Sequence, residues 1–198
     1  MKCGRDIESE DEEFCNDCSR LTRTYIRGFP LFKYAWPVND SIMEMKYAGK
    51  QEHATFYGEE LSEHFGETFR TLGMEAIIPV PLHKKKLLKR GYNQAQLLAE
   101  VVGKRLNIPV RTDVIIRKVN TTPQNELSGT QRLDNIKHAF APNPDYIKKK
   151  SREGRALNTV LLLDDIYTTG ATIQACTDVC HAVGIENVYY TSPCIAEE

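Results

Sequence analysis

The sequence has no hydrophobic run long enough to cross a membrane. No apolar stretch approaches the roughly 20 residues that a spanning helix requires, and the start of the chain has no signal-peptide pattern. The first absence excludes an integral membrane protein built from helices, and the second argues against secretion. We therefore expect a cytoplasmic protein with no membrane insertion.

An excess of charge of one sign is also missing. Lys and Arg number 26, Asp and Glu number 27, and the formal net charge is -1. A protein that coats nucleic acid by bulk charge is excluded, so any such contact would need a local basic patch. The 41% hydrophobic and 27% charged residues exclude wholesale disorder. The 198 residues fit one substantial domain with a small appendage.

Cysteine is too sparse and too unevenly placed for a disulfide framework of the kind found in small secreted domains. Three of the six cysteines lie near the N-terminus and three in the C-terminal part. Cys176 and Cys180 are four positions apart on an expected helix and would share one face. We interpret these two as buried core thiols.

The chain divides into three parts: residues 1–24, 25–74 and 75–198. The first is polar and cysteine-rich, and its acidic run "ESEDEE" indicates a solvated loop between cysteines. The second should hold an extended segment at Phe29–Val38 and a short helix that Asn39 or Asp40 caps and that ends near Gly49. A longer helix over His53–Leu72 follows, because its apolar residues recur at near-helical spacing.

From Glu75 onward, strand and helix patterns alternate. The strand patterns are "AIIPVP", "TVLLLDD", "NVYYTSP" and, less clearly, "PVRTDVIIR"; the helix patterns are "NQAQLLAEVVGKRL" and "TIQACTDVCHAVG". "PNPDYIKKKSREGRAL" indicates a connection or a hairpin. The alternation predicts an α/β fold with right-handed crossovers: a doubly wound, mainly parallel sheet with flanking helices. The nearly pure aliphatic "TVLLL" suits the buried centre of such a sheet.

The stretch "LLLDDIYTTGAT" has the composition of an anion-binding turn. Ligands of such sheets bind beyond the carboxyl ends of the strands, where this strand ends and the next helix begins. Gly170 permits a backbone conformation that other residues avoid. Backbone N–H groups, the hydroxyls of Thr168, Thr169 and Thr172, and the helix N-terminus would form a phosphate cup. Neither the Walker ending Gly-Lys-Ser/Thr nor the dinucleotide pattern G-x-G-x-x-G is present.

Two adjacent acids, Asp164 and Asp165, stand directly before this cup. Carboxylates repel phosphate, but they accept hydrogen bonds from hydroxyl groups. A ligand with a 5′-phosphate and a nearby diol satisfies both halves of the motif, and ribose 5-phosphate is such a ligand. The alternative is an ordinary strand-to-helix turn with exposed acids.

Four apolar residues, two acids and "TTGAT" resemble the phosphoribosyl-pyrophosphate motif of type I phosphoribosyltransferases. The resemblance implies that Asp164 and Asp165 hold the 2′- and 3′-hydroxyls of the ribose. It assigns the 5′-phosphate to the loop, namely Thr168, Thr169, Gly170, Ala171 and Thr172.

Further motifs narrow the resemblance. "IIPVPLHKKKLLKRGYNQAQLLAE" and "KVNTTPQNELSGTQRLDNIKHAF", behind a cysteine-rich start, are similar to the ComF branch of this superfamily. The similarity covers nearly the whole chain in the right order. Competence-associated members of this branch are linked to DNA uptake in natural transformation, so the resemblance implies that role and a type I phosphoribosyltransferase-like fold.

A basic segment follows the first strand of the core and should lie at the same edge as the cup: Lys84, Lys85, Lys86, Lys89 and Arg90. The resemblance brings the preceding turn to the pyrophosphate. We expect phosphate contacts from Lys84 and from Arg90, whose planar guanidinium suits bidentate binding. A solvated basic helix start is one alternative. Another is a contact with single-stranded nucleic acid, with Tyr92 as a stacking platform.

The polar stretch "RKVNTTPQNELSGTQRLDNI" corresponds, by the same resemblance, to the flexible loop that closes over the reaction centre. That loop shields an oxocarbenium-like centre and neutralises the departing pyrophosphate. We assign a catalytic role to Lys118 and Arg132, with Gln124 and Arg117 as further candidates and a plain surface loop as the alternative. Mg²⁺ would be carried largely by the diphosphate. No acceptor-base pocket can be identified, so ligand binding is predicted more directly than transfer.

The start "MKCGRDIESEDEEFCNDC" resembles a zinc knuckle. Cys15 and Cys18 form a C-x-x-C pair and Cys3 matches half of another, whereas an all-cysteine zinc site needs four thiolates. The missing partner would precede Met1, so the start is truncated or this chain has lost a ligand. Water or a borrowed side chain could complete a Zn²⁺ site, and unliganded surface cysteines are the alternative.

Two functions therefore compete. One is a phosphoribosyltransferase that uses phosphoribosyl pyrophosphate with Mg²⁺. The other is a competence accessory protein that binds single-stranded DNA or a helicase-like partner and keeps a regulatory or vestigial nucleotide site. We favour a ligand-binding phosphoribosyltransferase-like fold that serves DNA uptake.

Overall fold

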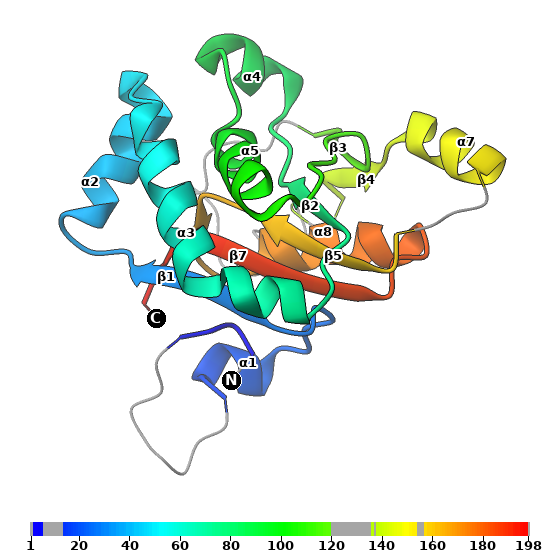
Figure 1. The fold of residues 1–198 in the computed structure, drawn as a ribbon, viewed down its shortest axis with the longest axis horizontal. Helices are drawn as coiled ribbons and strands as arrows, with labels where there is room; N and C mark the ends of the chain where they lie inside the picture. Colours follow the sequence, from blue (N-terminus) through cyan, green and yellow to red (C-terminus); the bar gives the residue numbers. More distant parts are fainter. Residues whose placement is uncertain (1, 6–13, 120–135, 137, 154–156, 198) are drawn as a thin grey trace.

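The centre of the protein is a parallel β-sheet, seen in a computed structural model that describes residues 2–5, 14–119, 136, 138–153 and 157–197 (Figure 1). Its strands follow the order β1-β7-β5-β2, and each neighbouring pair is parallel. The short β6 pairs with the end of β7. The bounds are β1 (Gly28–Lys33), β2 (Ala76–Pro79), β5 (Thr159–Leu163), β6 (Ile166–Tyr167) and β7 (Asn187–Ile195).

Helices cover both faces of this sheet, because successive strand residues point to opposite sides. In β5, Leu161 and Leu163 pack on the side of α3 (Glu52–Thr71) and α5 (Gln94–Leu106). Val160 and Leu162 pack on the opposite side, beneath α8 (Ala171–Ala182). Figure 1 shows α3 and α5 in front of the sheet and α8 behind it. The predicted doubly wound, mainly parallel fold with flanking helices is confirmed.

The α8 side of the sheet also holds the cysteine-rich start of the chain. Cys3 and Tyr25 are buried in the same core cluster as α8, and the short helix α1 (Asn16–Arg20) lies between them in sequence. The backbone N–H of Gly28 donates to Lys2 O, which ties the first residues to β1. Cys176 and Cys180 are fully buried, so their interpretation as core thiols is confirmed.

The predicted short helix before Gly49 forms, but it begins earlier and ends differently. It starts as α2 (Val38–Met43), directly after Pro37 rather than at Asn39 or Asp40. Its last turn is a π-helix, η1 (Glu44–Ala48), which ends at Gly49 with φ 75°. Isolated π-turns inside helices are frequent at functional sites.

The interpretation of "PNPDYIKKKSREGRAL" as a connection or hairpin is wrong. Most of it forms the helix α7 (Pro144–Glu153). Asn143 caps this helix, since its side chain accepts from the N–H of Asp145 at 3.1 Å. Proline at the first helical position has a φ suited to the helix and no N–H to lose there. The Asn-Pro pair was thus a helix start, which the basic composition of the rest concealed.

Two further elements stand at the edge of this framework. Only the last residues of "PVRTDVIIR" form a strand, β3 (Ile115–Arg117), which pairs antiparallel with β4 (Phe140–Pro142). The basic helix α4 (Lys84–Arg90) stands away from the sheet at the top of Figure 1.

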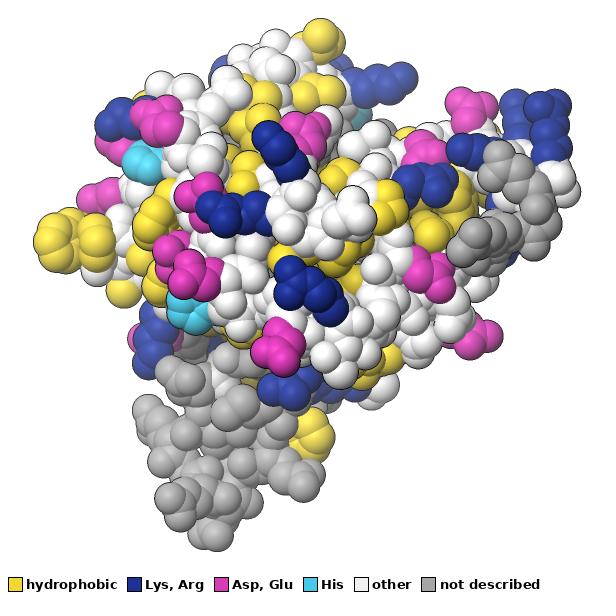
Figure 2. Space-filling model, in the orientation of Figure 1, with side chains coloured by type: hydrophobic (Ala, Val, Ile, Leu, Met, Phe, Trp, Pro, Cys, Tyr) yellow, Lys and Arg dark blue, Asp and Glu magenta, His cyan; other side chains and the backbone are white. Residues whose placement is uncertain are grey.

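The helices of the described residues are not strongly apolar, and the face of the protein shown in Figure 2 does not carry charge of one sign alone. Among the helices of the described residues, none combines the length and the apolar character that a membrane span requires. Cationic and anionic side chains are interspersed on the face shown in Figure 2. On that face, neither sign of charge forms a large continuous area.

Candidate functional site

The two predicted acids lie at the carboxyl end of β5, beside β7. The backbone N–H of Asp164 still donates to Thr191 O across the sheet at 3.2 Å. The chain then turns, and the N–H of Asp165 donates to Asp164 Oδ1 at 2.9 Å. Both residues are half-buried. The sheet therefore holds the backbone of the pair, and the turn fixes one oxygen of Asp164.

Burial disfavours full ionisation of this pair. Burial, followed by the charge of Asp165, raises the pKa of Asp164 to about 7. The N–H of Asp165 and the charges of Lys46 and Arg117 act in the opposite direction. Two carboxylates in one poorly solvated place cannot both ionise freely, so the pair holds less than two negative charges near neutral pH.

Lys46 is the cation of this site, and no motif in the sequence identified it. Its Nζ lies 3.0 Å from Asp165 Oδ1, with the two side chains only 16% and 15% exposed. Burial opposes the charge of Lys46, but Asp165 and Asp164 outweigh it and raise the pKa of the amine. Lys46 comes from η1, far from the acids in sequence, so only the fold brings them together.

The predicted phosphate loop follows within a few residues. Gly170 has φ 73° and is the N-cap of α8, which confirms the positive φ expected there. Thr168 and Thr169 are exposed, Thr172 is half-buried, and Ala171 is the first residue of the helix. Backbone N–H groups, hydroxyls and the positive end of a 12-residue helix thus lie in one turn, as an anion site requires.

Two arginines from the N-terminal part of the chain bind the backbone carbonyl oxygens of this loop. Arg5 donates through Nη2 to Thr168 O at 2.6 Å, and Arg23 donates through Nη2 to Thr169 O. The C=O and N–H of a trans peptide point in opposite directions. These bonds therefore turn the N–H groups of Thr169 and Gly170 away from the arginines, where an anion could meet them. Neither contact could be predicted from the sequence.

An aromatic stack supports the same loop. Tyr167 stacks on Tyr190, with ring centroids 4.7 Å apart and an interplanar angle of 10°. Its hydroxyl lies 2.9 Å from that of Tyr25 in the core. A Cβ added to Gly170 would lie 2.2 Å from the Tyr167 hydroxyl. Glycine is thus required twice at this position, by its φ and by the ring beneath it.

Positive charge gathers near the acids, but from partly different residues than predicted. Burial, and then the charges of Arg117 and Arg90, lower the pKa of half-buried Lys86. Burial also lowers the pKa of Arg117, and the charge of Asp164 opposes this shift. Arg117 and Arg90 both act on Lys86, and Arg117 also acts on Asp164, so positive charge extends from α4 toward the acid pair.

The other predicted cations are exposed, are bound to other side chains or lie outside the described residues. Lys84 is exposed on α4, and Lys118 is exposed just after β3. Arg90 donates to Gln94 Oε1 and lies over the Tyr47 ring, 5.2 Å from its centroid, rather than at the phosphate loop. Arg132, with Gln124, lies outside the described residues.

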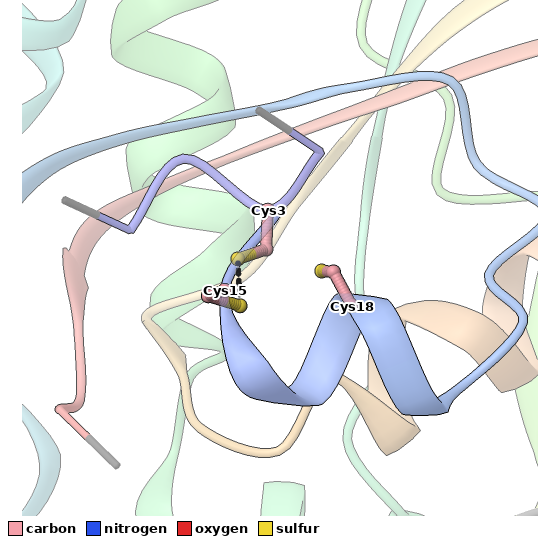
Figure 3. A group of neighbouring side chains, drawn as sticks. All are labelled: Cys3, Cys15 and Cys18. Atoms are coloured by element: carbon pink, nitrogen blue, oxygen red, sulfur yellow. Dashed lines mark hydrogen bonds between the residues drawn. The ribbon is translucent and has the colours of Figure 1, made fainter. Parts of the chain in front are cut away.

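The three N-terminal cysteines come together (Figure 3). The Sγ atoms of Cys3, Cys15 and Cys18 all lie within 4.8 Å of one another, and those of Cys3 and Cys15 are 3.4 Å apart. Burial raises the pKa of the Cys3 thiol to about 12 and also raises the pKa of Cys18. The closeness of the three sulfur atoms, and not their raised pKa, is what suits Zn²⁺, and no fourth Cys, His, Asp or Glu joins them within the described residues.

The acid pair, unlike the cysteine cluster, is not suited to the metal ion expected beside it, Mg²⁺. Hard divalent cations need ionised oxygen ligands. Asp165 is already neutralised by Lys46, and burial favours the protonated form of Asp164. The acids therefore fit Mg²⁺ poorly as direct ligands.

The loop geometry predicts that Gly170→Ala is more damaging than an ordinary substitution at positive φ. Gly73 has φ 67° with nothing within 4 Å of an added Cβ, so Gly73→Ala measures backbone strain alone, about 1–2 kcal/mol. Gly170→Ala adds the clash with Tyr167 and should destabilise by at least about 1 kcal/mol more. Urea unfolding of both variants measures the difference. Equal losses would show that the ring moves aside freely.

Comparison with other proteins finds no matching family model. Two solved structures are similar: TT1426 from Thermus thermophilus, with 16% identity over 69% of this chain and 71% of that one, and a purine phosphoribosyltransferase from Pyrococcus horikoshii, with 14% identity over 86% and 89%. Both have a TM-score of 0.36. Scores this low support no inference about this chain.

The curated relatives are more informative. Competence protein F of Haemophilus influenzae is 35% identical over 114 residues, which are 58% of this chain but only 47% of that protein. Competence protein ComFC of Bacillus subtilis is 29% identical over 87% of this chain and 67% of its own length. DNA utilization protein YhgH of Escherichia coli K12 is 26% identical over 80% and 67%. The chain is thus similar, over most of its length, to proteins named for competence and for DNA utilization.

Proposed function

We propose that this protein binds the ribose 5-phosphate part of phosphoribosyl pyrophosphate, or of a related nucleotide, at the carboxyl end of β5. One observation carries the proposal: a half-buried acid pair stands a few residues before a loop with a positive-φ glycine at the start of α8. The acids can accept from sugar hydroxyls, and the loop can donate to a phosphate. Each hydrogen bond to the charged phosphate would contribute about 1.5–3 kcal/mol.

The cations near the acids would serve the diphosphate. Arg117 supplies positive charge near Asp164, and Lys86 lies near Arg117. Arg132 would be a further cation for the diphosphate. Mg²⁺ would arrive with the diphosphate, since the acids fit it poorly. If the ribosyl group is then transferred, Lys118 and Arg132 remain our candidates for stabilising the leaving pyrophosphate.

We further propose that this binding serves DNA uptake in the cytoplasm. The support is the relatives' names, competence protein F, ComFC and DNA utilization protein. The chain matches about half of the length of the Haemophilus influenzae protein, so the biological role is an inference from part of that relative.

Replacement of both acids tests the ligand site. Calorimetric titration of the native chain with phosphoribosyl pyrophosphate and Mg²⁺ should give saturable heat. Asp164→Asn with Asp165→Asn should fold but lose the binding, because neutral amides are weaker acceptors and reverse part of the hydrogen-bond pattern. We expect affinity to fall by about a hundredfold or more, the effect of two charge-assisted hydrogen bonds.

A matched control removes the same charge elsewhere: Asp145→Asn with Glu63→Gln, both exposed, should bind as the native chain does. Asp164→Asn alone keeps the ion pair of Lys46 and should weaken binding even if the double variant is unstable. Absence of heat and of thermal shift with the native chain would rule out the ligand site. Unchanged affinity in the acid variants would mean that the ribose contacts are misassigned.

We also propose that Cys3, Cys15 and Cys18 hold one Zn²⁺, with water or another side chain in the fourth position. Elemental analysis after dialysis should find about one zinc per chain, as in other structural sites. Cys15→Ser should lose most of it, because two thiolates bind zinc far more weakly than three. Cys180→Ala removes a thiol buried in α8 and should keep the metal. Zinc-free native protein, or equal zinc in both variants, would contradict this site.

Single-stranded DNA binding at α4 is the second candidate function. The helix carries exposed Lys84, Lys85 and Lys89 and stands away from the sheet (Figure 1). Tyr92, by contrast, is no stacking platform, because it is half-buried and its hydroxyl donates to Met45 O. A helicase-like protein that docks on α4 is the form this candidate takes if the helix binds no DNA.

Salt-dependent binding of a labelled oligonucleotide tests α4. Replacing the three exposed lysines by Gln should weaken binding and reduce the slope of log K against log salt by about 0.7 for each phosphate that is no longer neutralised. The control replaces three exposed lysines elsewhere by Gln: Lys50, Lys104 and Lys148. No binding at low salt, or equal effects of both triple variants, would rule out direct DNA contact through α4.

A further inference from the structure

The element that carries Lys46 is held in place by the "RGYNQA" motif. The Tyr92 hydroxyl donates to Met45 O at 2.6 Å, and Gln94 Nε2 donates to the same oxygen at 3.5 Å. Arg90 donates to Gln94 Oε1 at 2.5 Å and lies over the Tyr47 ring. Three side chains of the motif therefore hold the residues on either side of Lys46.

The π-helical turn places these neighbours differently. Met45 is fully buried and Tyr47 is 70% exposed, whereas Lys46 reaches inward to the acids. Glu44, the nearest acid in sequence, is occupied by Lys50 at 2.7 Å and His53 at 2.9 Å. It does not compete for Lys46, so the amine is left to Asp165.

In this arrangement, each of the two acids has one carboxylate oxygen engaged and one available to accept a hydrogen bond. One oxygen of Asp164 accepts from the N–H of Asp165, and one oxygen of Asp165 is paired with Lys46. Within the described part of the chain, the second oxygen of each carboxylate makes no hydrogen bond. Two adjacent carboxylates, each with one engaged and one available oxygen, match the two hydroxyls of a vicinal diol.

We propose that Lys46 is the positioning residue that sets Asp165 for the ribose diol, and that "RGYNQA" acts by holding Lys46 rather than by touching the ligand. This inference rests on the proposed ribose 5-phosphate site and adds which sugar the site selects. The site takes a ribose phosphate and rejects the 2-deoxyribose analogue. A buried acceptor built for a hydroxyl is left unpaired when that hydroxyl is missing, and this is strongly disfavoured.

Lys46 also explains why the acids need no metal. A lysine ammonium already neutralises Asp165 at 3.0 Å. Binding of ribose 5-phosphate, which lacks a diphosphate, should therefore be the same with Mg²⁺ and with a chelator. Only ligands that carry their own diphosphate should respond to Mg²⁺.

Calorimetry with ribose 5-phosphate and 2-deoxyribose 5-phosphate tests the inference. The native chain should prefer ribose 5-phosphate by about tenfold or more, the factor for one charge-assisted hydrogen bond. Lys46→Met should lose most of this preference yet bind inorganic phosphate as before, since the phosphate loop is untouched. Lys148→Met, which removes an exposed lysine on α7, should keep the native preference. Tyr92→Phe should reduce the preference while leaving every residue of the acid pair and loop in place.

The outcomes separate the two proposals. If the native chain binds neither sugar phosphate nor inorganic phosphate, the proposed site itself fails. If it binds both sugars equally, or if folded Lys46→Met keeps the native preference, the role of Lys46 is overturned and the phosphate site stands. Should Lys46→Met not fold, Lys46→Arg and Tyr92→Phe decide. Lys46→Arg keeps the positive charge and should keep the preference for ribose 5-phosphate, whereas Tyr92→Phe should reduce it. The opposite result in either variant would overturn the role of Lys46.

Discussion

The ion pair between Lys46 and Asp165 is the constraint on which the site depends. Two carboxylates at the buried end of a strand are costly, because a desolvated charge must be paired or neutralised. A cation must therefore reach them from elsewhere in the chain. That cation comes from η1, whose backbone is held by Tyr92 and Gln94 at the start of α5. The segment before α3 supplies the lysine of this ion pair, and the start of α5 holds that segment in place.

The phosphate loop has a second support on its other side. Arg5 and Arg23 bind its carbonyl oxygens, and Tyr167 packs beneath Gly170. Arg5 follows Cys3 by two residues, and Cys3 O accepts from the Tyr190 hydroxyl of the aromatic stack. The cysteine cluster is thus joined to the loop by hydrogen bonds and by packing. The cysteine-rich start is therefore part of the packing that supports the loop.

The parts of this site that lie within one short stretch of sequence could be predicted, whereas the contacts between distant parts of the chain could not. β5, the turn at Gly170 and α8 could be predicted because aliphatic runs, a positive-φ glycine and helical periodicity are encoded within a few residues. Lys46, Arg5 and Arg23 could not, since their partners lie at distant positions and no spacing indicates them. The lysine-rich "IKKK" likewise hid α7, although its Asn-Pro start was readable. A phosphate contact was expected for Arg90, whereas the structure shows the arginine bound to Gln94 and lying over Tyr47, where we propose that it holds η1.

The two candidate functions fit one molecule because their elements are adjacent and still distinct. If the acid pair binds a ribose diol, as we propose, DNA would be a poor ligand there because deoxyribose lacks the 2′-hydroxyl. DNA would have to bind elsewhere, and α4 is the exposed basic element whose end joins the motif that holds the site. α4 ends at Arg90, the first residue of the motif that holds η1. α4 and η1 therefore meet at Arg90, which donates to Gln94 and lies over the Tyr47 ring. On the two proposals, a ribose phosphate and DNA would bind different elements that share this one arginine.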